Sequence, residues 1–242
     1  MVSNEQMKDV MNSPLGIEAQ LAAEGLVLRI DGSKPLSAEA VAAVTAVCDR
    51  AEDRADQAPV IVQVSGAPTE PWTEELTVSL VSKWERALRR LERLPRPTIA
   101  IAEGDCGGIA LDALLATDYR IATGSVRLTV SVDNGATWPG MAVYRLANHG
   151  VFAAAIRRAV LFGTPIEAAD ALSMHLVDEV TEDVADSLTR TAERTGAVQG
   201  SELAIRRQLM LDATITGFEE ALGVHLAACD RTLRRAASAA AA

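Results

Sequence analysis

Apolar residues follow two different spacings between residues 25 and 130, and the two spacings alternate along the chain. In some segments every second residue is apolar, as in a buried or half-buried strand. In others the apolar residues recur three or four positions apart, as on one face of a helix. The first kind covers residues 26–30, 60–64, 98–102, 119–122 and 126–130, and the second covers 40–53, 74–94 and 109–116. This alternation predicts an α/β core.

From about residue 141 the pattern is helical almost throughout, and only residues 177–180 are typical of a strand. The two longest helices are predicted at 201–213 and 217–235. We therefore divide the chain into three parts. They are an N-terminal extension (1–24), an α/β core (25–140) and a helical C-terminal part with a role in oligomerisation (141–242).

A glycine-rich turn separates the strand around Ile99 and Ile101 from the next helix. Gly104, Gly107 and Gly108 allow a tight bend without a Cβ penalty. The turn stands at a helix N-terminus, where unpaired N–H groups and the positive end of the helix dipole attract negative charge. The sequence therefore predicts a site for an anion, or for a carbonyl oxygen that gains negative charge during a reaction.

Charge and cysteine content exclude several classes of protein. The net charge of −10 and a pI near 4.9 argue against nucleic acid or an anionic membrane as the partner. The three cysteines are too widely spaced for a disulfide framework or a CxxC metal site, so no metal is expected. No run reaches the roughly 18 apolar residues of a membrane span, and the first residues lack signal-peptide features, so we expect a cytoplasmic protein.

Three known motifs compete for the glycine-rich turn. The dinucleotide fingerprint needs G-x-G-x-x-G, a spacing that these glycines lack, and a phosphate loop needs Lys and Ser or Thr after the last glycine. The sequence GDCGG at 104–108 resembles the nucleophile motif of chymotrypsin-like cysteine proteases. In that family the histidine precedes the nucleophile, whereas all three histidines here follow Cys106. Cys106 is therefore interpreted as a small buried residue.

The same stretch resembles the crotonase (enoyl-CoA hydratase/isomerase) superfamily. That family places two glycines at a helix start, an acidic residue on the helix, and an Asp before a Y-R-I-A strand. The matching residues are Gly107, Gly108, Asp112, Asp118 and residues 119–122. A later apolar-Pro-Gly turn is matched at Trp138. The resemblance covers roughly residues 25–235 and implies a spiral of ββα units with a helical C-terminal part, assembled as trimers or hexamers.

The resemblance also implies an acyl-CoA thioester as substrate, held with its carbonyl oxygen in an oxyanion hole of two backbone N–H donors. It puts the second donor at Ile109, beside Gly108, and loss of one such donor typically costs about 100- to 1000-fold in rate. The first donor is expected between Trp72 and Glu75. CoA then enters only as part of the substrate, and no cofactor is implied. The alternative is that the glycines serve only close helix packing.

The acidic residues depart from the family pattern. Hydratases of the family use two glutamates, whereas here the first position holds Asp112 and the second aligns with Val132. One acid cannot easily both activate water and protonate Cα, and each role commonly contributes about 100- to 10,000-fold to the rate. Ordinary two-glutamate hydration is therefore not expected. Asp133 is a candidate substitute acid, although strand alternation would point it away from the face of Val132. Trp138 is a further candidate, and the alternative for Asp112 is a surface position.

Within the superfamily, the chain most resembles the hydratase-like accessory proteins of 3,5-dihydroxyphenylglycine assembly in actinobacterial glycopeptide antibiotic pathways. The stretches that carry this likeness are residues 26–41, 80–95, 104–123 and 133–147. It implies work beside a type III polyketide synthase and a second crotonase, in the dehydration and aromatisation that form 3,5-dihydroxyphenylacetyl-CoA. The alternative is an inactive homologue that binds and assists a catalytic partner.

The last two predicted helices carry an apolar stripe that a core of this size would struggle to bury alone. Its residues are Leu203, Leu209, Leu211, Phe218, Leu222, Leu226 and Leu233. Crotonases bury such helices against their own core or against a neighbouring subunit. We therefore expect a homotrimer or hexamer, able to exchange subunits with a partner crotonase. The alternative is that the helices fold back onto their own domain.

Overall fold

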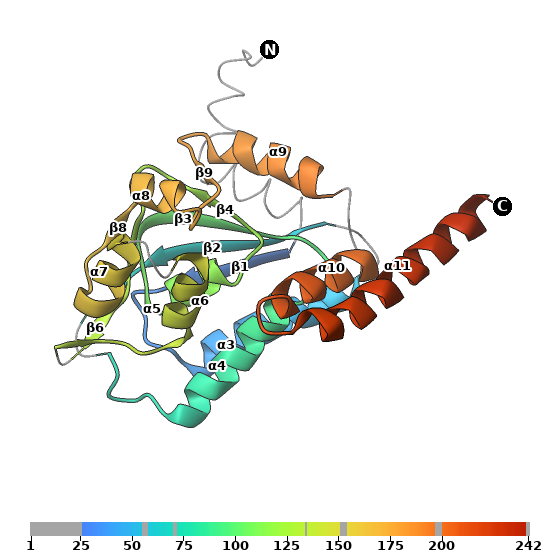
Figure 1. The fold of residues 1–242 in the computed structure, drawn as a ribbon. Helices are drawn as coiled ribbons and strands as arrows, with labels where there is room; N and C mark the ends of the chain where they lie inside the picture. Colours follow the sequence, from blue (N-terminus) through green and yellow to red (C-terminus); the bar gives the residue numbers. More distant parts are fainter. Residues whose placement is uncertain are drawn as a thin grey trace, which may run out of the picture.

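The computed structural model describes residues 26–54, 58–69, 72–133, 135–150, 154–196 and 200–240. The predicted N-terminal extension lies outside these residues. Within the described part, strands and helices alternate up to β5, and helices predominate from residue 141 onward (Figure 1). The predicted α/β fold with a helical C-terminal part is therefore confirmed.

The centre of the molecule is a mostly parallel sheet in the order β1-β2-β3-β4-β9. β5 pairs with the end of β3, and β8 pairs antiparallel with β5. The strands are β1 (Leu26–Asp31), β2 (Val60–Gly66), β3 (Thr98–Gly107), β4 (Tyr119–Ala122), β5 (Arg127–Thr129), β8 (Ile166–Glu167) and β9 (Glu179–Val180). β3 lies in the middle of the sheet. It continues through Gly104 to Gly107, so most of the predicted glycine-rich turn is strand that pairs with β5, and α5 begins at Gly108.

Three helices cover one face of the sheet: α3 (Ala38–Asp53), α4 (Val78–Leu91) and α5 (Gly108–Leu115) (Figure 1). Ser37 caps α3 and Thr77 caps α4, each accepting a hydrogen bond from a backbone N–H three residues on. The sequence pattern predicted that this helix begins at residue 74, but α4 begins at Val78. The main hydrophobic core lies between these helices and the sheet.

The other face of the sheet is covered by α9 (Val184–Thr195) (Figure 1). Leu188 of this helix packs with isoleucines of β2, β3 and β4 in a second, smaller cluster. Because successive side chains of a strand point to opposite faces, the same three strands supply both clusters. β2 and β3 therefore consist largely of buried apolar residues, as expected for a parallel sheet covered on both sides.

The C-terminal part contains five further helices besides α9. They are α6 (Met141–Gly150), α7 (Ala154–Phe162), α8 (Ala168–Ser173), α10 (Ser201–Asp212) and α11 (Phe218–Ala240). Two details differ from the prediction. Val132–Asp133 (β6) and Ala136–Thr137 (β7) form a small hairpin where a loop was predicted, and β8 interrupts a stretch predicted to be helical.

A buried ion pair attaches α10 to the core. The Arg207 side chain is 5% exposed and donates to both carboxylate oxygens of Asp118 and to the carbonyls of Leu94 and Arg96. α11 extends from this attachment away from the sheet (Figure 1). The four stripe residues on α11 are all exposed, namely Phe218, Leu222, Leu226 and Leu233. The stripe therefore offers an apolar surface for another subunit, and the expected trimer or hexamer stays a prediction.

Candidate active site

The glycine-rich turn gives α5 an unusual first residue. Gly108 has φ +51, in the left-handed region that favours glycine, and a Cβ there would lie 3.2 Å from the ring carbons of Pro68. Its N–H donates to Oγ of Ser131 at 3.0 Å and is therefore already occupied. The N–H of Ile109 comes next in the first helical turn, where no intrahelical acceptor exists. Of the two predicted donor residues, Ile109 is thus the one whose N–H is placed to meet a ligand.

The packing explanation holds for some of the glycines. A Cβ on Gly107 would lie 2.5 Å from Oγ1 of Thr129, and one on Gly32 would lie 2.4 Å from the carbonyl oxygen of Gly107. These two glycines therefore let the turn, β5 and the loop after β1 pack closely. Gly104 differs, since nothing lies within 4 Å of its Cβ position and its φ is +62.

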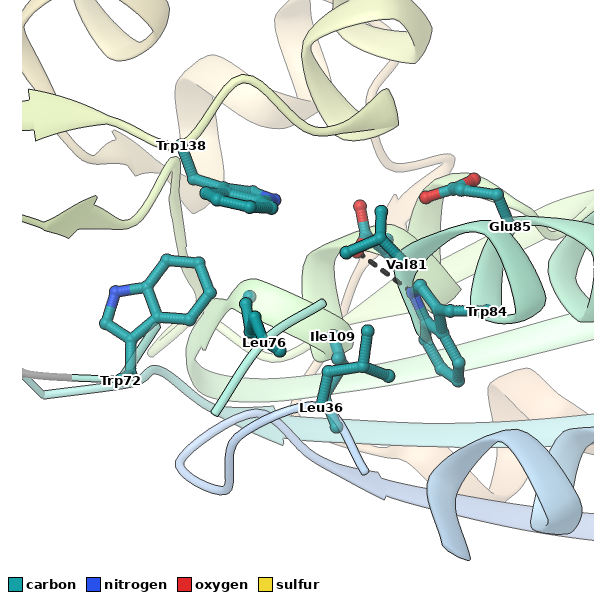
Figure 2. Close-up of a pocket in the computed structure, with 10 residues that line it drawn as sticks. Leu36, Trp72, Leu76, Val81, Trp84, Glu85, Ile109 and Trp138 are labelled. Atoms are coloured by element: carbon teal, nitrogen blue, oxygen red, sulfur yellow. Dashed lines mark hydrogen bonds between the residues drawn. The ribbon is translucent and has the colours of Figure 1, made fainter. Parts of the chain in front are cut away.

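Ile109 lines a narrow pocket with a cavity volume of about 20 Å³ between α4, α5 and the loops before α4 and α6 (Figure 2). Its wall is mostly apolar and aromatic, with two carboxyl groups. The lining residues are Leu36, Trp72, Leu76, Val81, Trp84, Glu85, Gly108, Ile109, Asp112 and Trp138. The predicted candidates Gly108, Ile109, Asp112 and Trp138 thus meet in one place.

Two tryptophans form one wall of the pocket. The rings of Trp72 and Trp138 meet edge to face, with centroids 5.3 Å apart and an interplanar angle of 72° (Figure 2). The Trp72 indole N–H also donates to the carbonyl oxygen of Val132 at 3.3 Å, which ties this wall to the β6–β7 hairpin. Such a wall suits a flat, unsaturated or aromatic group, because aromatic rings pack well edge to face or offset.

Asp112 is a buried residue of the pocket, so the alternative of a surface position is wrong. Its side chain is 9% exposed and accepts a hydrogen bond from the Trp84 indole N–H at 3.1 Å. Burial raises the pKa of Asp112 from 3.8 to about 7, and the nearby Glu85 carboxylate adds to the rise. Hydrogen bonds from Trp84 and the Ala142 backbone, together with the charge of Arg145, oppose it. A carboxyl that titrates near neutral pH can both give and take a proton.

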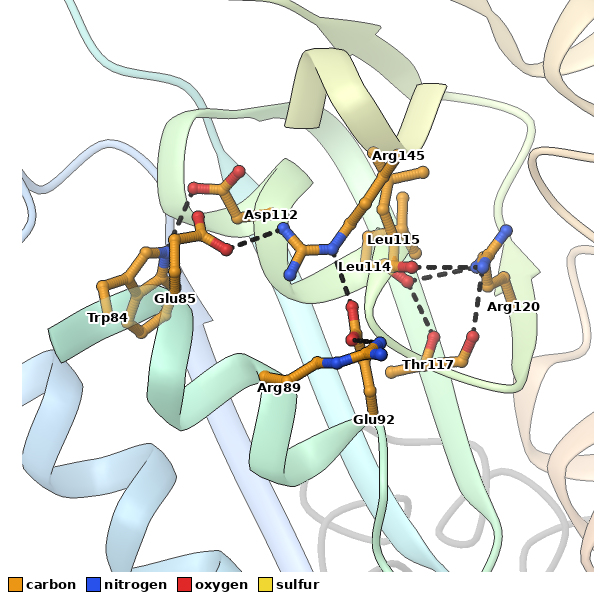
Figure 3. A network of polar contacts seen from close by, with 10 residues as sticks. All are labelled: Trp84, Glu85, Arg89, Glu92, Asp112, Leu114, Leu115, Thr117, Arg120 and Arg145. Carbon is orange, nitrogen blue, oxygen red and sulfur yellow. Dashed lines mark hydrogen bonds and ion pairs between the residues drawn. The ribbon is translucent and has the colours of Figure 1, made fainter. Parts of the chain in front are cut away.

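Glu85 is a functional candidate that the sequence reasoning missed. It follows Trp84 on α4, and its carboxylate lies 3.0 Å from the Arg145 guanidinium of α6 (Figure 3). Arg145 also pairs with Glu92 at 2.8 Å, and Glu92 with Arg89 at 2.8 Å. Burial raises the pKa of Glu85, while Arg145 acts to lower it. A signal for Glu85 was present, because it stands four residues after Val81 and three before Leu88, on the apolar side of the predicted helix.

The position that aligns with the second family glutamate carries no acid toward this pocket. A methyl carbon of Val132 lies 2.5 Å from the Cβ position of Gly163, so its side chain packs against the turn after α7. Asp133 belongs to β6, and its side chain lies outside the described residues. From the loop after β2, the residue beside Gly108 is Pro68, which has no N–H to donate. The first oxyanion donor, expected between Trp72 and Glu75, stays a prediction.

Two other functions are not supported by the described part of the chain. Cys106 is buried with its sulfur 3.7 Å from the Val64 carbonyl oxygen, and burial raises its pKa to about 12, so the reactive thiolate is disfavoured. Within the described ranges, no three His, Cys, Asp or Glu side chains are grouped so that they could bind a metal ion. Nor does any described helix combine the length and apolar character needed to cross a membrane.

The arrangement agrees with comparisons to known proteins. A profile of the family described as enoyl-CoA hydratase/isomerase matches residues 65–227. A protein from Amycolatopsis orientalis described as an enoyl-CoA hydratase is 56% identical over 213 residues, which span 88% of this chain and 98% of that protein.

Solved structures show the same fold at low sequence identity. An enoyl-CoA hydratase from Mycobacterium smegmatis has a TM-score of 0.72 at 18% identity, over 86% of this chain and 87% of that one. An enoyl-CoA hydratase from Polaromonas sp. JS666 has a TM-score of 0.72 at 20% identity, over 87% and 89%.

Proposed function

This chain belongs to the enoyl-CoA hydratase/isomerase family, and we propose that it removes water from a polyketide-derived acyl-CoA thioester, assisting the formation of 3,5-dihydroxyphenylacetyl-CoA. The observation that carries the proposal is the juxtaposition of Ile109 and Asp112 in one pocket. The first offers a backbone N–H at a helix start, and the second is a carboxyl with a pKa of about 7.

The chemistry follows from these two groups. A thioester carbonyl oxygen bound at the Ile109 N–H gains negative charge when a Cα proton leaves, and the donor and the helix N-terminus stabilise the resulting enolate. A hydroxyl on Cβ then departs as water if an acid supplies a proton. With a pKa raised to about 7, Asp112 can carry a proton at neutral pH, so it can be that acid.

The pocket wall supports an aromatic or near-aromatic acyl group. Trp72 and Trp138 present ring edges and faces to the pocket, and Leu36, Leu76 and Val81 complete an apolar lining. A cyclised polyketide thioester that loses water becomes flat as its ring turns aromatic. Such a product gains contact area against the two indole rings.

The proposal includes partners. A type III polyketide synthase would supply the thioester from malonyl-CoA, and a second crotonase would share the later steps, all in the cytoplasm. CoA enters as part of the substrate, and we propose no separate cofactor. The exposed apolar stripe of α11 supports assembly as a homotrimer or hexamer.

The test is a coupled assay of malonyl-CoA with the synthase, the second crotonase and this protein, added singly and together. We expect 3,5-dihydroxyphenylacetyl-CoA to accumulate faster when this protein is present, and Asp112→Asn to remove most of that gain. Asp53→Asn serves as the matched control, because Asp53 is an exposed carboxylate outside the pocket and receives the same substitution. No gain from the parent protein would contradict the proposal.

A second function is favoured by Val132 at the position of the second family glutamate. In that alternative the chain binds a catalytic partner and assists it without chemistry of its own. The same assay separates the two, because an Asp112→Asn variant that stimulates as well as the parent would favour the non-catalytic role.

A further inference from the structure

We propose that Glu85 of α4 is the second acid–base carboxyl of this pocket, paired with Asp112 in place of the glutamate that the family pattern would put at position 132. The inference rests on the proposed function and deepens it. It assigns the Cα proton to Glu85 and the leaving hydroxyl group to Asp112.

The geometry brings the two carboxyl groups together from different elements. Glu85 and Asp112 both line the pocket, and Figure 3 shows both carboxyl groups next to Trp84. The Glu85 charge contributes to the raised pKa of Asp112. Val132, by contrast, is turned toward Gly163.

The charges around the pair favour one shared proton. Arg145 on α6 faces the pair, and it also pairs with Glu92, the residue after α4. If Asp112 and Glu85 were both ionised, two carboxylates would repel each other beside a guanidinium that Glu92 already shares. One proton on the pair removes that repulsion.

The ion pair to Arg145 decides where that proton resides. The guanidinium lies 3.0 Å from the Glu85 carboxylate and favours its charged form, whereas Asp112 is buried and accepts hydrogen bonds from the Trp84 indole and a backbone N–H. Glu85 is therefore the carboxylate and Asp112 the carboxylic acid when a substrate arrives. Two carboxyls with separated acidities are what an elimination of water requires.

The step balances with these two groups alone. The Glu85 carboxylate takes a proton from Cα, and the electron pair of that C–H bond forms the enolate, whose oxygen lies at the Ile109 N–H. The enolate then forms the Cα=Cβ bond as the Cβ–O bond breaks, and Asp112 donates its proton to the departing oxygen. Water leaves, the pair still holds one proton, and transfer from Glu85 to Asp112 restores the starting state.

The competing explanation is that Glu85 merely holds Arg145 in place. Glu92 provides a matched control, because it also pairs with Arg145 but does not line the pocket. Glu85→Gln and Glu92→Gln each leave Arg145 one carboxylate partner. If Glu85 is only structural, the two variants should behave alike.

The test measures exchange of the Cα hydrogens of phenylacetyl-CoA in D₂O by NMR, a reaction that needs the base and the oxyanion donor but no leaving group. We expect Glu85→Gln to slow exchange about 100- to 10,000-fold, the range typical of a lost general base. Glu92→Gln should exchange within a few-fold of the parent. Asp112→Asn should keep most of the exchange while losing water elimination in the coupled assay.

The outcomes separate this proposal from the proposed function. Exchange by Glu85→Gln at the parent rate overturns the role of Glu85 and leaves the proposed function standing, whereas parent protein that exchanges no faster than buffer overturns both. The melting temperatures of Glu85→Gln and Glu92→Gln control for folding. If both variants lose the same stability but only Glu85→Gln slows exchange of the Cα hydrogens, Glu85 has a chemical role. A carboxyl NMR titration adds a readout without substrate: Glu85→Gln should lower the pKa of Asp112, and an unchanged pKa contradicts the pairing.

Discussion

Replacing Asp112 by Asn should stabilise the protein at neutral and alkaline pH, by an amount that grows as the pH rises from about 4 to about 7 and then levels off. The pKa of Asp112 is about 7 in the folded chain and 3.8 when unperturbed, so ionisation between these values favours the unfolded state. The parent therefore loses stability as pH rises from about 4 to about 7. A shift of about 3 units corresponds to about 4 kcal/mol, at 1.36 kcal/mol per unit.

Between pH 5 and pH 8 the difference between the two proteins should change by about 2–3 kcal/mol, because only the parent ionises at this position. Asn has nearly the same size as Asp and keeps an oxygen that can accept the hydrogen bond from the Trp84 indole N–H. The substitution should therefore cost little stability by itself. For a chain of this length each kcal/mol moves the melting temperature by about 2–4 °C. The variant should thus melt several degrees above the parent at pH 8 and much closer to it at pH 5.

Urea unfolding at pH 5, 6, 7 and 8, at one protein concentration, measures this difference directly. Asp53→Asn is the control, since it makes the same substitution at an exposed position of the chain. If the free energy of unfolding of Asp112→Asn differs from that of the parent by the same amount at every pH, the reasoning is refuted. Asp112 would then not titrate near neutral pH in the folded protein.

Three further predictions concern the turn, the attachment of α10 and the assembly. Gly108→Val should reduce product formation in the coupled assay by about 100-fold or more, because a β-branched residue is strained at φ +51 and displaces the Ile109 donor; an unchanged yield would favour a packing role for this glycine. Arg207→Met should destabilise the chain by about 1.5–3 kcal/mol in urea, because it leaves the Leu94 and Arg96 carbonyls without their donor and removes the charged bond to the partly exposed Asp118, and an unchanged urea midpoint would contradict this. Light scattering should give a multiple of 25.6 kDa, and a monomer at micromolar concentration would contradict the expected trimer or hexamer.

The regular elements could be predicted because their local signals agree with their packing. The alternation in residues 26–30 and 60–64 corresponds to β1 and β2, whose inward residues form the core. The glycine-rich turn was recognisable for a similar reason, since a positive φ at the start of α5 restricts the sequence strongly. The limits of α4 were less accurate, because Thr77 competes with upstream residues as the cap.

The short pairings could not be predicted from local pattern. β6, β7 and β8 each have two residues, too few for any alternation to be visible. β6 and β7 pair with each other, whereas β8 exists because of a partner distant in sequence, with Ile166 beside Leu128. The acid–base pair was beyond prediction for the same reason, because Glu85 and Asp112 belong to different helices and only the tertiary fold brings them together.

The register of α4 is therefore the feature on which the chemistry of the site depends most. Trp84 donates to Asp112, and the next residue, Glu85, faces the same carboxyl from the adjoining side of the helix. The first contact favours the ionised form of Asp112 and the second opposes it, so neighbouring positions of one helix tune one pKa in opposite directions. A slip of α4 by one residue would turn both side chains by about 100° and remove both effects. The Thr77 cap and the buried Leu88 hold that register, and through it they set the acidity of a group on another helix.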